Sequence, residues 1–507
     1  MKYDCENGAF VISTYSWSSV FLFLVSALIY APVTSLANVF RIPYQNELTE
    51  INPLNLRSAS GSYIHHALFR NWLWINESNE LIPDLAEKCE WRGRLKLRCQ
   101  LKVGLKWSDG STMETKDFLD SYEFLLNPKS DFTRKESLFS VRGARKFAQG
   151  DIKKFSDVGI KQHAPRSIEF ELESIDPEFE FKLALPMTAP VKQKNFNVNL
   201  PIISSGPYRI KQYDSKSLEI KMESNPNYHI HATRPDLSFV YISDDSIQVP
   251  LFTKNQIDLV RRVPTAQIQQ WRKDKSFLGI EVLRFDYFGF NFSKIDKATR
   301  LAMSEVIDYN ELQSLLNSTG RPGCFDFSSL ALHKPLCIEI KKAKQILPTA
   351  PKIPIDLSYS HLGGEDHQRT GEWLKSEWKK YLDIEITPRQ IENKAFVSSL
   401  KTELPAVFRK GVPLETPLCY SAVKIFEPEN PENIFKLSDT FLKDKIAKLK
   451  NESRTSKQKV LCNSILEYIK SNAFIIPTGK YELSVLLRDP YRKLKFNKLN
   501  MADFSQY

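Results

Sequence analysis

The chain has 507 residues, of which 42% are hydrophobic and 26% are charged, and its formal net charge at pH 7 is +11. This length exceeds one ordinary core and predicts two or three lobes, and the composition is that of a globular protein rather than a disordered one. The lysines and arginines are scattered among acids without a long basic block. That pattern argues against a nucleic-acid partner.

The N-terminus has the pattern of a secretory signal peptide. Residues 20–33 form an apolar run of 14 residues, which is shorter than the ~20 that span a bilayer. Residues 35–37, Ser-Leu-Ala, place small side chains where a signal peptidase cleaves. Lys2 is outweighed by Asp4 and Glu6, which is atypical; a misassigned start codon explains this, and a retained anchor is the alternative. No cysteine lies directly after the apolar run, where a lipid would be attached. We therefore expect a periplasmic protein that is not a lipoprotein.

The cysteines predict disulfides, because export permits their formation. Each of two candidate pairs brackets a predicted turn or loop, and they join Cys89 to Cys99 and Cys324 to Cys337. The six cysteines after the signal allow fifteen full connectivities. For Cys419 and Cys462, free buried thiols are an equally good interpretation.

Hydrophobic periodicity predicts an α/β chain. The predicted strands lie, in chain order, at 38–43, 97–103, 167–172, 208–210, 218–222, 256–260, 285–292, 355–359, 384–387 and 473–476. The predicted helices lie at 63–74, 115–126, 266–272, 341–347, 369–382, 443–450 and 457–470. Strand 355–359, helix 369–382 and strand 384–387 predict a β-α-β unit with a parallel pair. Apolar and charged residues alternate in 167–172, which predicts an exposed edge strand.

Catalytic and metal-binding patterns are weak. The chain has no nucleophile elbow, phosphate-binding loop or dinucleotide-binding glycine motif. His229 and His231 lie in a polar stretch typical of surface histidines. His361 and His367 lack the helical spacing of a zinc protease. We therefore expect no catalytic residue, no metal ion and no cofactor.

An ordered set of short motifs runs through most of the chain after the signal. In order, they are 81–87, 97–110 with Trp107-Ser108-Asp109-Gly110, 115–124, Gly206-Pro207-Tyr208, Asn225-Pro226-Asn227-Tyr228, 256–258, Asn291, 300–302 with 307–308, and 343–347. Each motif alone is ordinary turn or cap chemistry that builds the lobes. Their order resembles the family 5 extracellular solute-binding proteins, the oligopeptide- and dipeptide-binding type.

The resemblance implies an α/β, bilobed periplasmic-binding-protein-like fold of the class II type with an extra inserted lobe. The expected parts are a signal peptide at 1–37, a discontinuous lobe I at 38–70, 200–285 and 475–507, an inserted lobe II at 71–199, and a lobe III at 286–474. The implied function is that of a substrate-binding component of an ABC importer. Such a monomer captures a peptide-like ligand between two lobes, closes by hinge motion and delivers the ligand to a membrane permease.

By the same resemblance, the ligand is held like an added strand, so that affinity comes from backbone hydrogen bonds. The implied ligand-binding residues are Arg57, Ser58, Ala59, Ser60, Arg261, Arg262, Arg409, Lys410, Gly411, Glu415 and Lys480. The family's aspartate, which holds the ligand's amino terminus, is expected at the position of Pro413, and Glu415 is the nearest acid.

The cations in this set suggest a cleft suited to an anionic ligand, because arginine binds carboxylates bidentately. The alternative is that these cations are surface residues or are paired with acids. The absent aspartate also leaves open a non-peptide ligand such as a metal chelate, haem or a sugar, or a protein that feeds a sensor. A secreted hydrolase is the alternative from another class, and it would need a nucleophile–base pair that the sequence does not show.

Overall fold

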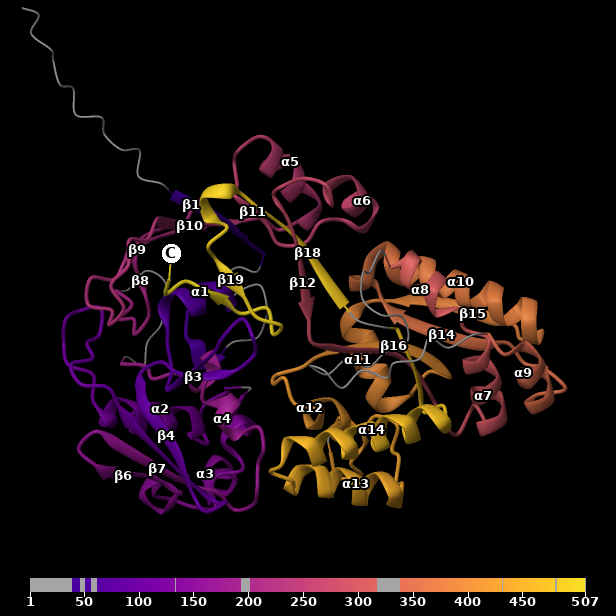
Figure 1. Cartoon of the computed structure of the whole chain (residues 1–507), viewed down its shortest axis with the longest axis horizontal. Coiled ribbons are helices and arrows are strands. Elements are labelled where there is room, and N and C mark those ends of the chain that lie inside the picture. The colour runs from indigo at the N-terminus through magenta and orange to yellow at the C-terminus, as the bar shows by residue number, and fades with distance from the viewer. Residues whose placement is uncertain are drawn as a thin grey trace, which may run out of the picture. The chain divides into compact units, whose positions relative to one another are not determined.

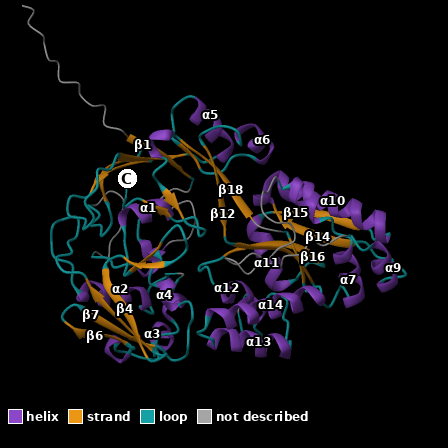
Figure 2. Ribbon diagram, in the orientation of Figure 1, coloured by secondary structure: helices purple, strands orange, loops and turns teal. Residues whose placement is uncertain are grey.

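The computed structural model describes residues 39–45, 51–55, 62–132, 134–192, 201–316, 338–430, 432–478 and 481–506. All of these residues belong to the compact unit Val39–Tyr507. Several predictions lie outside the described residues: the signal segment 1–37, Arg57, Ser58, Ala59, Ser60, Lys480, Cys324 and Cys337. Figure 1 labels the elements along the chain, and Figure 2 distinguishes helices from strands.

The first sheet has the strand order β1-β10-β9-β8. Its strands are β1 (Val39–Tyr44), β8 (Tyr208–Asp214), β9 (Glu219–Ser224) and β10 (Asp236–Tyr241). β1 runs parallel to β10 with Ile42 opposite Phe239. Both side chains are buried, so the apolar face of this sheet forms part of the first core cluster. This pairing confirms the predicted strand at 38–43 and brings together segments about 200 residues apart.

A second, antiparallel sheet has the order β4-β5-β7-β6. It comprises β4 (Ala86–Arg92), β5 (Lys96–Leu101), β6 (Ile160–Ala164) and β7 (Ser167–Glu171). The predicted edge position of 167–172 is wrong, because β7 pairs with β5 on one side and β6 on the other. The acids that suggested an edge lie on the polar face, where Glu169 pairs with Arg98 at 2.8 Å. The alternation of apolar and charged residues indicates a strand with one solvent-facing side. It does not show whether another strand, here β6, pairs along its edge.

Helix α2 (Thr115–Leu126) has the predicted bounds, because its signals are local. Its N-terminus carries a capping box between Glu114 and Asp117, and its apolar residues lie on one face. The predicted helix at 63–74 is too long: α1 (Ser62–Leu68) ends early and β2 (Leu73–Ile75) follows. After Leu68 the backbone turns to tertiary partners, since the Gly206 N–H donates to the Leu68 carbonyl at 2.8 Å.

Two further sheets are joined by two chain crossings. The three-stranded sheet has the order β11-β18-β12, and the five-stranded sheet has the order β15-β14-β16-β13-β17. The strands are β11 (Leu259–Val260), β12 (Phe277–Val282), β13 (Arg284–Phe290), β14 (Ile355–Ser360), β15 (Ile386–Ile391), β16 (Val407–Pro413), β17 (Ile475–Pro477) and β18 (Tyr481–Leu487). The chain passes from one sheet to the other between β12 and β13 and returns between β17 and β18.

The predicted β-α-β unit is confirmed, because β14 and β15 are parallel and joined through α10 (Gly364–Leu382). α10 packs on β15, and α11 (Asn393–Thr402) packs on β14; Figure 2 labels these helices and strands. The other helices are α3 (Ala144–Gln149), α4 (Phe179–Lys182), α5 (Gln248–Thr253), α6 (Ile268–Trp271), α7 (Lys297–Glu305), α8 (Tyr309–Leu315), α9 (Ile340–Ile346), α12 (Cys419–Val423), α13 (Thr440–Asn451) and α14 (Thr455–Ser471). The remaining strands are β3 (Leu81–Pro83), β19 (Lys495–Phe496) and β20 (Ala502–Asp503).

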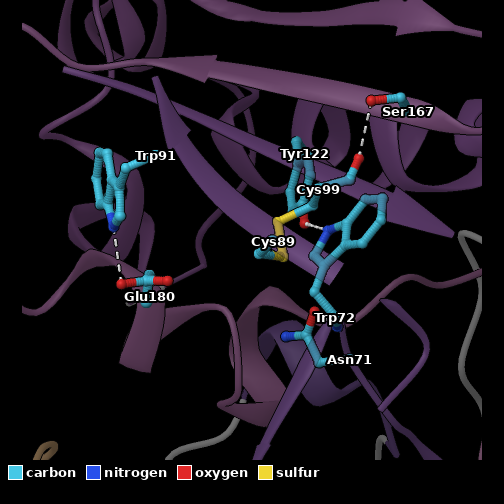
Figure 3. The surroundings of a disulfide bond; sticks show 8 residues. All are labelled: Asn71, Trp72, Cys89, Trp91, Cys99, Tyr122, Ser167 and Glu180. Atoms are coloured by element: carbon cyan, nitrogen blue, oxygen red, sulfur yellow. Dashed lines mark hydrogen bonds between the residues drawn. A yellow bond between two sulfur atoms is a disulfide. The ribbon is translucent and has the colours of Figure 1, made fainter. Parts of the chain in front are cut away.

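Two disulfides are present among the described residues. The predicted Cys89–Cys99 bond is confirmed, and its cysteines lie opposite each other on β4 and β5. Figure 3 shows this bond beside Trp72 and Tyr122, whose side chains are joined by a 2.9 Å hydrogen bond. Cys419 and Cys462 form the second bond, so the interpretation as free thiols is wrong. It links α12 to α14 across 43 residues, and only the tertiary packing of those helices brings the sulfurs together.

Candidate functional site

A cavity of about 380 Å³ lies where the three-stranded and five-stranded sheets are connected. Its wall includes the first residues of β13, the middle of β16, the end of β14, and the start of β18. Arg262, just after β11, the start of α10 and one face of α11 also contribute to the lining. The volume lies within the range of small-molecule and cofactor sites.

Gly411 makes room for an ion pair in this wall. It lies opposite Asp286 in the antiparallel β13–β16 ladder. Arg284 and Asp286 lie two residues apart on β13, and their side chains pair at 3.1 Å. A β-carbon added at Gly411 would overlap Asp286 Oδ1 and Arg284 Nη2. The glycine therefore lets this pair lie across the strand at the cavity.

Two more acids line the cavity, and each has a cationic partner. Asp366 accepts a hydrogen bond from Arg369 at 2.9 Å and also lies 3.5 Å from Arg262 Nη2. Glu482 lies 3.1 Å from Arg272 Nη2. Among the described lining residues, every carboxylate is thus already engaged by a guanidinium.

Arg409 has the opposite environment. Its exposed fraction is 8%, yet no described carboxylate lies within ion-pair distance of it. Its contacts are a long 3.5 Å approach of Nη1 to Thr370 Oγ1 and the ring of Phe288 at 5.7 Å. Burial lowers the pKa of Arg409, although Asp286 acts in the other direction. The guanidinium nonetheless stays charged at physiological pH, and a buried charge without a partner is unfavourable.

His367 on α10 lies beside this guanidinium. Its Nδ1 is 3.2 Å from the Ser360 carbonyl oxygen, which only accepts, so Nδ1 carries the hydrogen. Burial, followed by the charge of Arg409, lowers the pKa of His367 to about 3. The ring is therefore neutral at physiological pH, and it adds no charge beside the guanidinium of Arg409.

The structure brings four of the predicted binding residues to the cavity: Arg262, Arg409, Lys410 and Gly411. The Lys410 ammonium pairs with Glu432 at 3.0 Å. The other two described residues are not in the lining: the Arg261 N–H donates to Gln248 Oε1 at 3.0 Å, and Glu415 pairs with Arg134 at 2.8 Å. The alternative that the cations are paired with acids thus holds for Arg262 and Lys410, but not for Arg409.

Several lining residues were not predicted. Arg284, Asp286 and Thr478 lie at the two chain crossings, and no local pattern distinguishes them from ordinary strand residues. For His367, the sequence raises only the question of metal binding and gives no sign of a position beside Arg409. On α11, the residues at 393, 396, 397 and 400 share one helix face, a spacing that periodicity can reveal.

Two further kinds of site are relevant to function, a cluster of metal ligands and a membrane-spanning helix. Within the described ranges, no group of three or more His, Cys, Asp or Glu side chains is placed to hold a metal ion. No described helix has both the length and the apolar character needed to cross a membrane.

Comparison with known proteins identifies the class of this fold and site. Residues 80–413 match the family described as "Bacterial extracellular solute-binding proteins, family 5 Middle". The chain belongs to this family of solute-binding proteins, as its motif order predicted, and family members are binding proteins rather than enzymes.

Individual relatives are distant but extensive. The probable deoxycholate-binding periplasmic protein YgiS of Escherichia coli K12 is 24% identical over 420 residues, covering 75% of this chain and 78% of that protein. The periplasmic murein peptide-binding protein MppA of the same strain is 23% identical over 366 residues, covering 66% and 67%. The solved structure titled "MppA Periplasmic Murein Tripeptide Binding Protein, Unliganded Open Form" aligns with a TM-score of 0.78 at 19% identity, covering 93% of this chain and 96% of that one. These likenesses confirm the expected bilobed α/β periplasmic-binding fold.

Proposed function

We propose that this protein is the periplasmic substrate-binding component of an ABC importer, and that it binds a peptide-like ligand through a carboxylate at Arg409. The family supports a binding role, and relatives named as murein peptide-binding and oligopeptide-binding proteins support a peptide ligand and a membrane permease as partners. One observation carries the carboxylate assignment. The described acids in the wall are all paired, whereas the buried Arg409 guanidinium has no described acidic partner.

A ligand carboxylate would supply that partner. Arginine presents a planar fork of donors that matches a carboxylate, and charge-assisted hydrogen bonds of this kind are roughly twice as strong as neutral ones. A ligand ammonium has no such partner among the described lining residues, because Asp286, Asp366 and Glu482 are each engaged by an arginine. Recognition in this cavity therefore favours the acidic end of a ligand over its amino end.

Calorimetric titration of a tripeptide tests this proposal. We expect trialanine with a free carboxylate to bind at least about 10-fold more tightly than trialanine amide, since one charged partner of a buried guanidinium is lost. Arg409→Gln should abolish that difference. The matched control is Arg389→Gln, an exposed arginine on β15 of the same sheet that does not line the cavity. Equal binding of acid and amide by the unchanged protein would refute the role of Arg409.

The organisation of the chain is a further part of the proposal. We propose a signal peptide at 1–37 without lipid attachment, a monomeric mature protein, and lobes at 38–70 with 200–285 and 475–507, at 71–199, and at 286–474. The separate sheets of the described residues support three lobes. Mass spectrometry of the exported protein should give a mature chain that begins at Asn38 without an acyl group; a larger or acylated product would contradict this.

A further inference from the structure

Apolar side chains line part of the cavity that also holds the buried charge of Arg409. Phe396, Val397 and Leu400 of α11 line it together with Leu362. We call these four side chains the apolar wall. The three helix residues, at spacings of three and four, lie on one face of α11. Asn393 is the polar lining residue on the same helix face.

Part of the apolar wall is left uncovered by the protein. Phe396 and Leu400 are buried in the second core cluster. Val397, by contrast, is 46% exposed and Leu362 is 64% exposed, although both line the cavity. Covering such side chains with an apolar group is favourable, because it removes apolar surface from water. The cavity thus offers bare apolar surface to whatever occupies it.

Hydrogen bonds hold the exposed part of the wall in place. Leu362 belongs to a short 3₁₀ turn, His361–Gly363, and its N–H donates to Ser360 Oγ at 3.2 Å. The Asn393 N–H, at the start of α11, donates to His361 Nδ1 at 3.0 Å. The turn is therefore tied both to the end of β14 and to the helix that carries Val397. A wall held in this way needs little rearrangement to receive a ligand.

We infer that the ligand carries a bulky apolar group next to its carboxylate, with the carboxylate at Arg409 and the apolar group on the apolar wall. This inference rests on the proposed function, and it adds the property that selects one carboxylate over another. A polar or acidic neighbour would leave Leu362 and Val397 in water. Two sources share this chemistry: a peptide that ends in a large apolar residue, and a steroid carboxylate such as the one named for a relative.

The test compares probes that share a carboxylate and differ beside it. We expect Ala-Ala-Phe to bind at least about 10-fold more tightly than Ala-Ala-Ser in calorimetric titration. In the double variant Leu362→Ser/Val397→Ser, this ratio should fall to about 2-fold or less, because the apolar surface that favours Ala-Ala-Phe is removed. The matched control is Ile353→Ser, because Ile353 is 79% exposed but lies outside the cavity. Thermal unfolding verifies the fold, and Val397→Thr alone, with a smaller loss, replaces the double variant if that protein unfolds.

Each result is decisive. Equal affinities for the two tripeptides, or a ratio that the wall variants leave unchanged, would overturn the inference while leaving the carboxylate site intact. Binding of deoxycholate that is lost in both Arg409→Gln and the wall variant would support the inference and assign the steroid source. Failure of both tripeptides and deoxycholate to bind the unchanged protein would refute the proposed carboxylate site together with the inference.

Discussion

Two buried arginines of this protein have opposite surroundings. Arg70 is 4% exposed and Arg409 is 8% exposed. Arg70 pairs with Asp84 and, at 3.2 Å, with Asp503, and its guanidinium lies 3.7 Å from the ring centre of Trp74. Arg409 has no acidic partner among the described residues, and its contacts are a 3.5 Å hydrogen bond to Thr370 and the ring of Phe288. The first arginine is neutralised within the fold, and the second is not.

The difference shows which kind of burial points to function. Burial lowers the pKa of both guanidinium groups, but at Arg70 the combined effect of Asp84, Tyr228 and Asp503 is larger, so that its pKa is raised overall. A buried cation with its partners is part of the core, and removing one partner leaves an uncompensated charge. At Arg409 the missing partner is one that an external anion could supply. The partners, rather than the burial, distinguish the two roles.

The largest expected effect is at the neutralised arginine. Asp84→Asn should lower the free energy of unfolding by about 3 kcal/mol, because the Arg70 charge stays buried while its closest carboxylate is lost. Urea unfolding followed by circular dichroism measures this, with Asp444→Asn on the exposed face of α13 as the control. Surface substitutions usually change the free energy of unfolding by less than about 1 kcal/mol. If Asp84→Asn differed from the control by no more than this, the Arg70–Asp84 pair would not be structural.

The free energy of unfolding should also depend on pH through His66, a buried histidine whose pKa is influenced by Arg70. Burial, with the charges of His65 and Arg70, lowers the pKa of His66 to about 3, and His66 Nδ1 accepts a hydrogen bond from the Ala502 N–H at 3.4 Å. Below about pH 6.5 the unfolded chain takes up a proton that the folded chain excludes, so stability falls as the pH falls.

Between pH 7 and pH 5, this one histidine should contribute a loss of about 2 kcal/mol, from about 1.5 pH units at about 1.36 kcal/mol each. His66→Asn keeps an acceptor oxygen and removes the titration, so its unfolding free energy should change by about 2 kcal/mol less than that of the unchanged protein over this range. Parallel pH profiles of the two proteins would contradict the assignment.

Gly411→Ala should produce a smaller effect, at the arginine without partners. The new β-carbon would displace the Arg284–Asp286 pair, and because both side chains are flexible at their ends we expect a loss of about 1 kcal/mol. Moving Asp286 toward Arg409 would also compete with a ligand carboxylate. The affinity for trialanine should therefore fall, and an unchanged affinity and stability would show that the glycine has no role in the cavity.

The smallest effect on stability should come from Arg409 itself. Arg409→Gln should change the free energy of unfolding by less than about 1 kcal/mol in either direction, because it removes a charge with no described partner. Arg70→Gln should lose about 3 kcal/mol under the same conditions. Equal losses for the two variants would mean that Arg409, like Arg70, belongs to the core rather than to a binding site.

Sequence alone determined the family, the α/β class and the elements whose signals are local. Helix Thr115–Leu126 was predicted with its observed bounds because its cap and its apolar face lie within 13 residues of chain. The Cys89–Cys99 bond was predicted because both cysteines flank one hairpin. Such features depend on neighbours in the chain, which a sequence displays directly.

Tertiary structure decided which distant groups meet. It placed β7 inside its sheet, joined Cys419 to Cys462, and brought Arg284 and Asp286 across a ladder from Gly411. Above all, it decided which cations have acids beside them: Arg262 and Lys410 do, and Arg409 does not. A sequence shows that a residue is charged. Whether that charge is compensated depends on contacts between segments far apart in the chain, and on this depends whether an arginine stabilises the fold or binds a ligand.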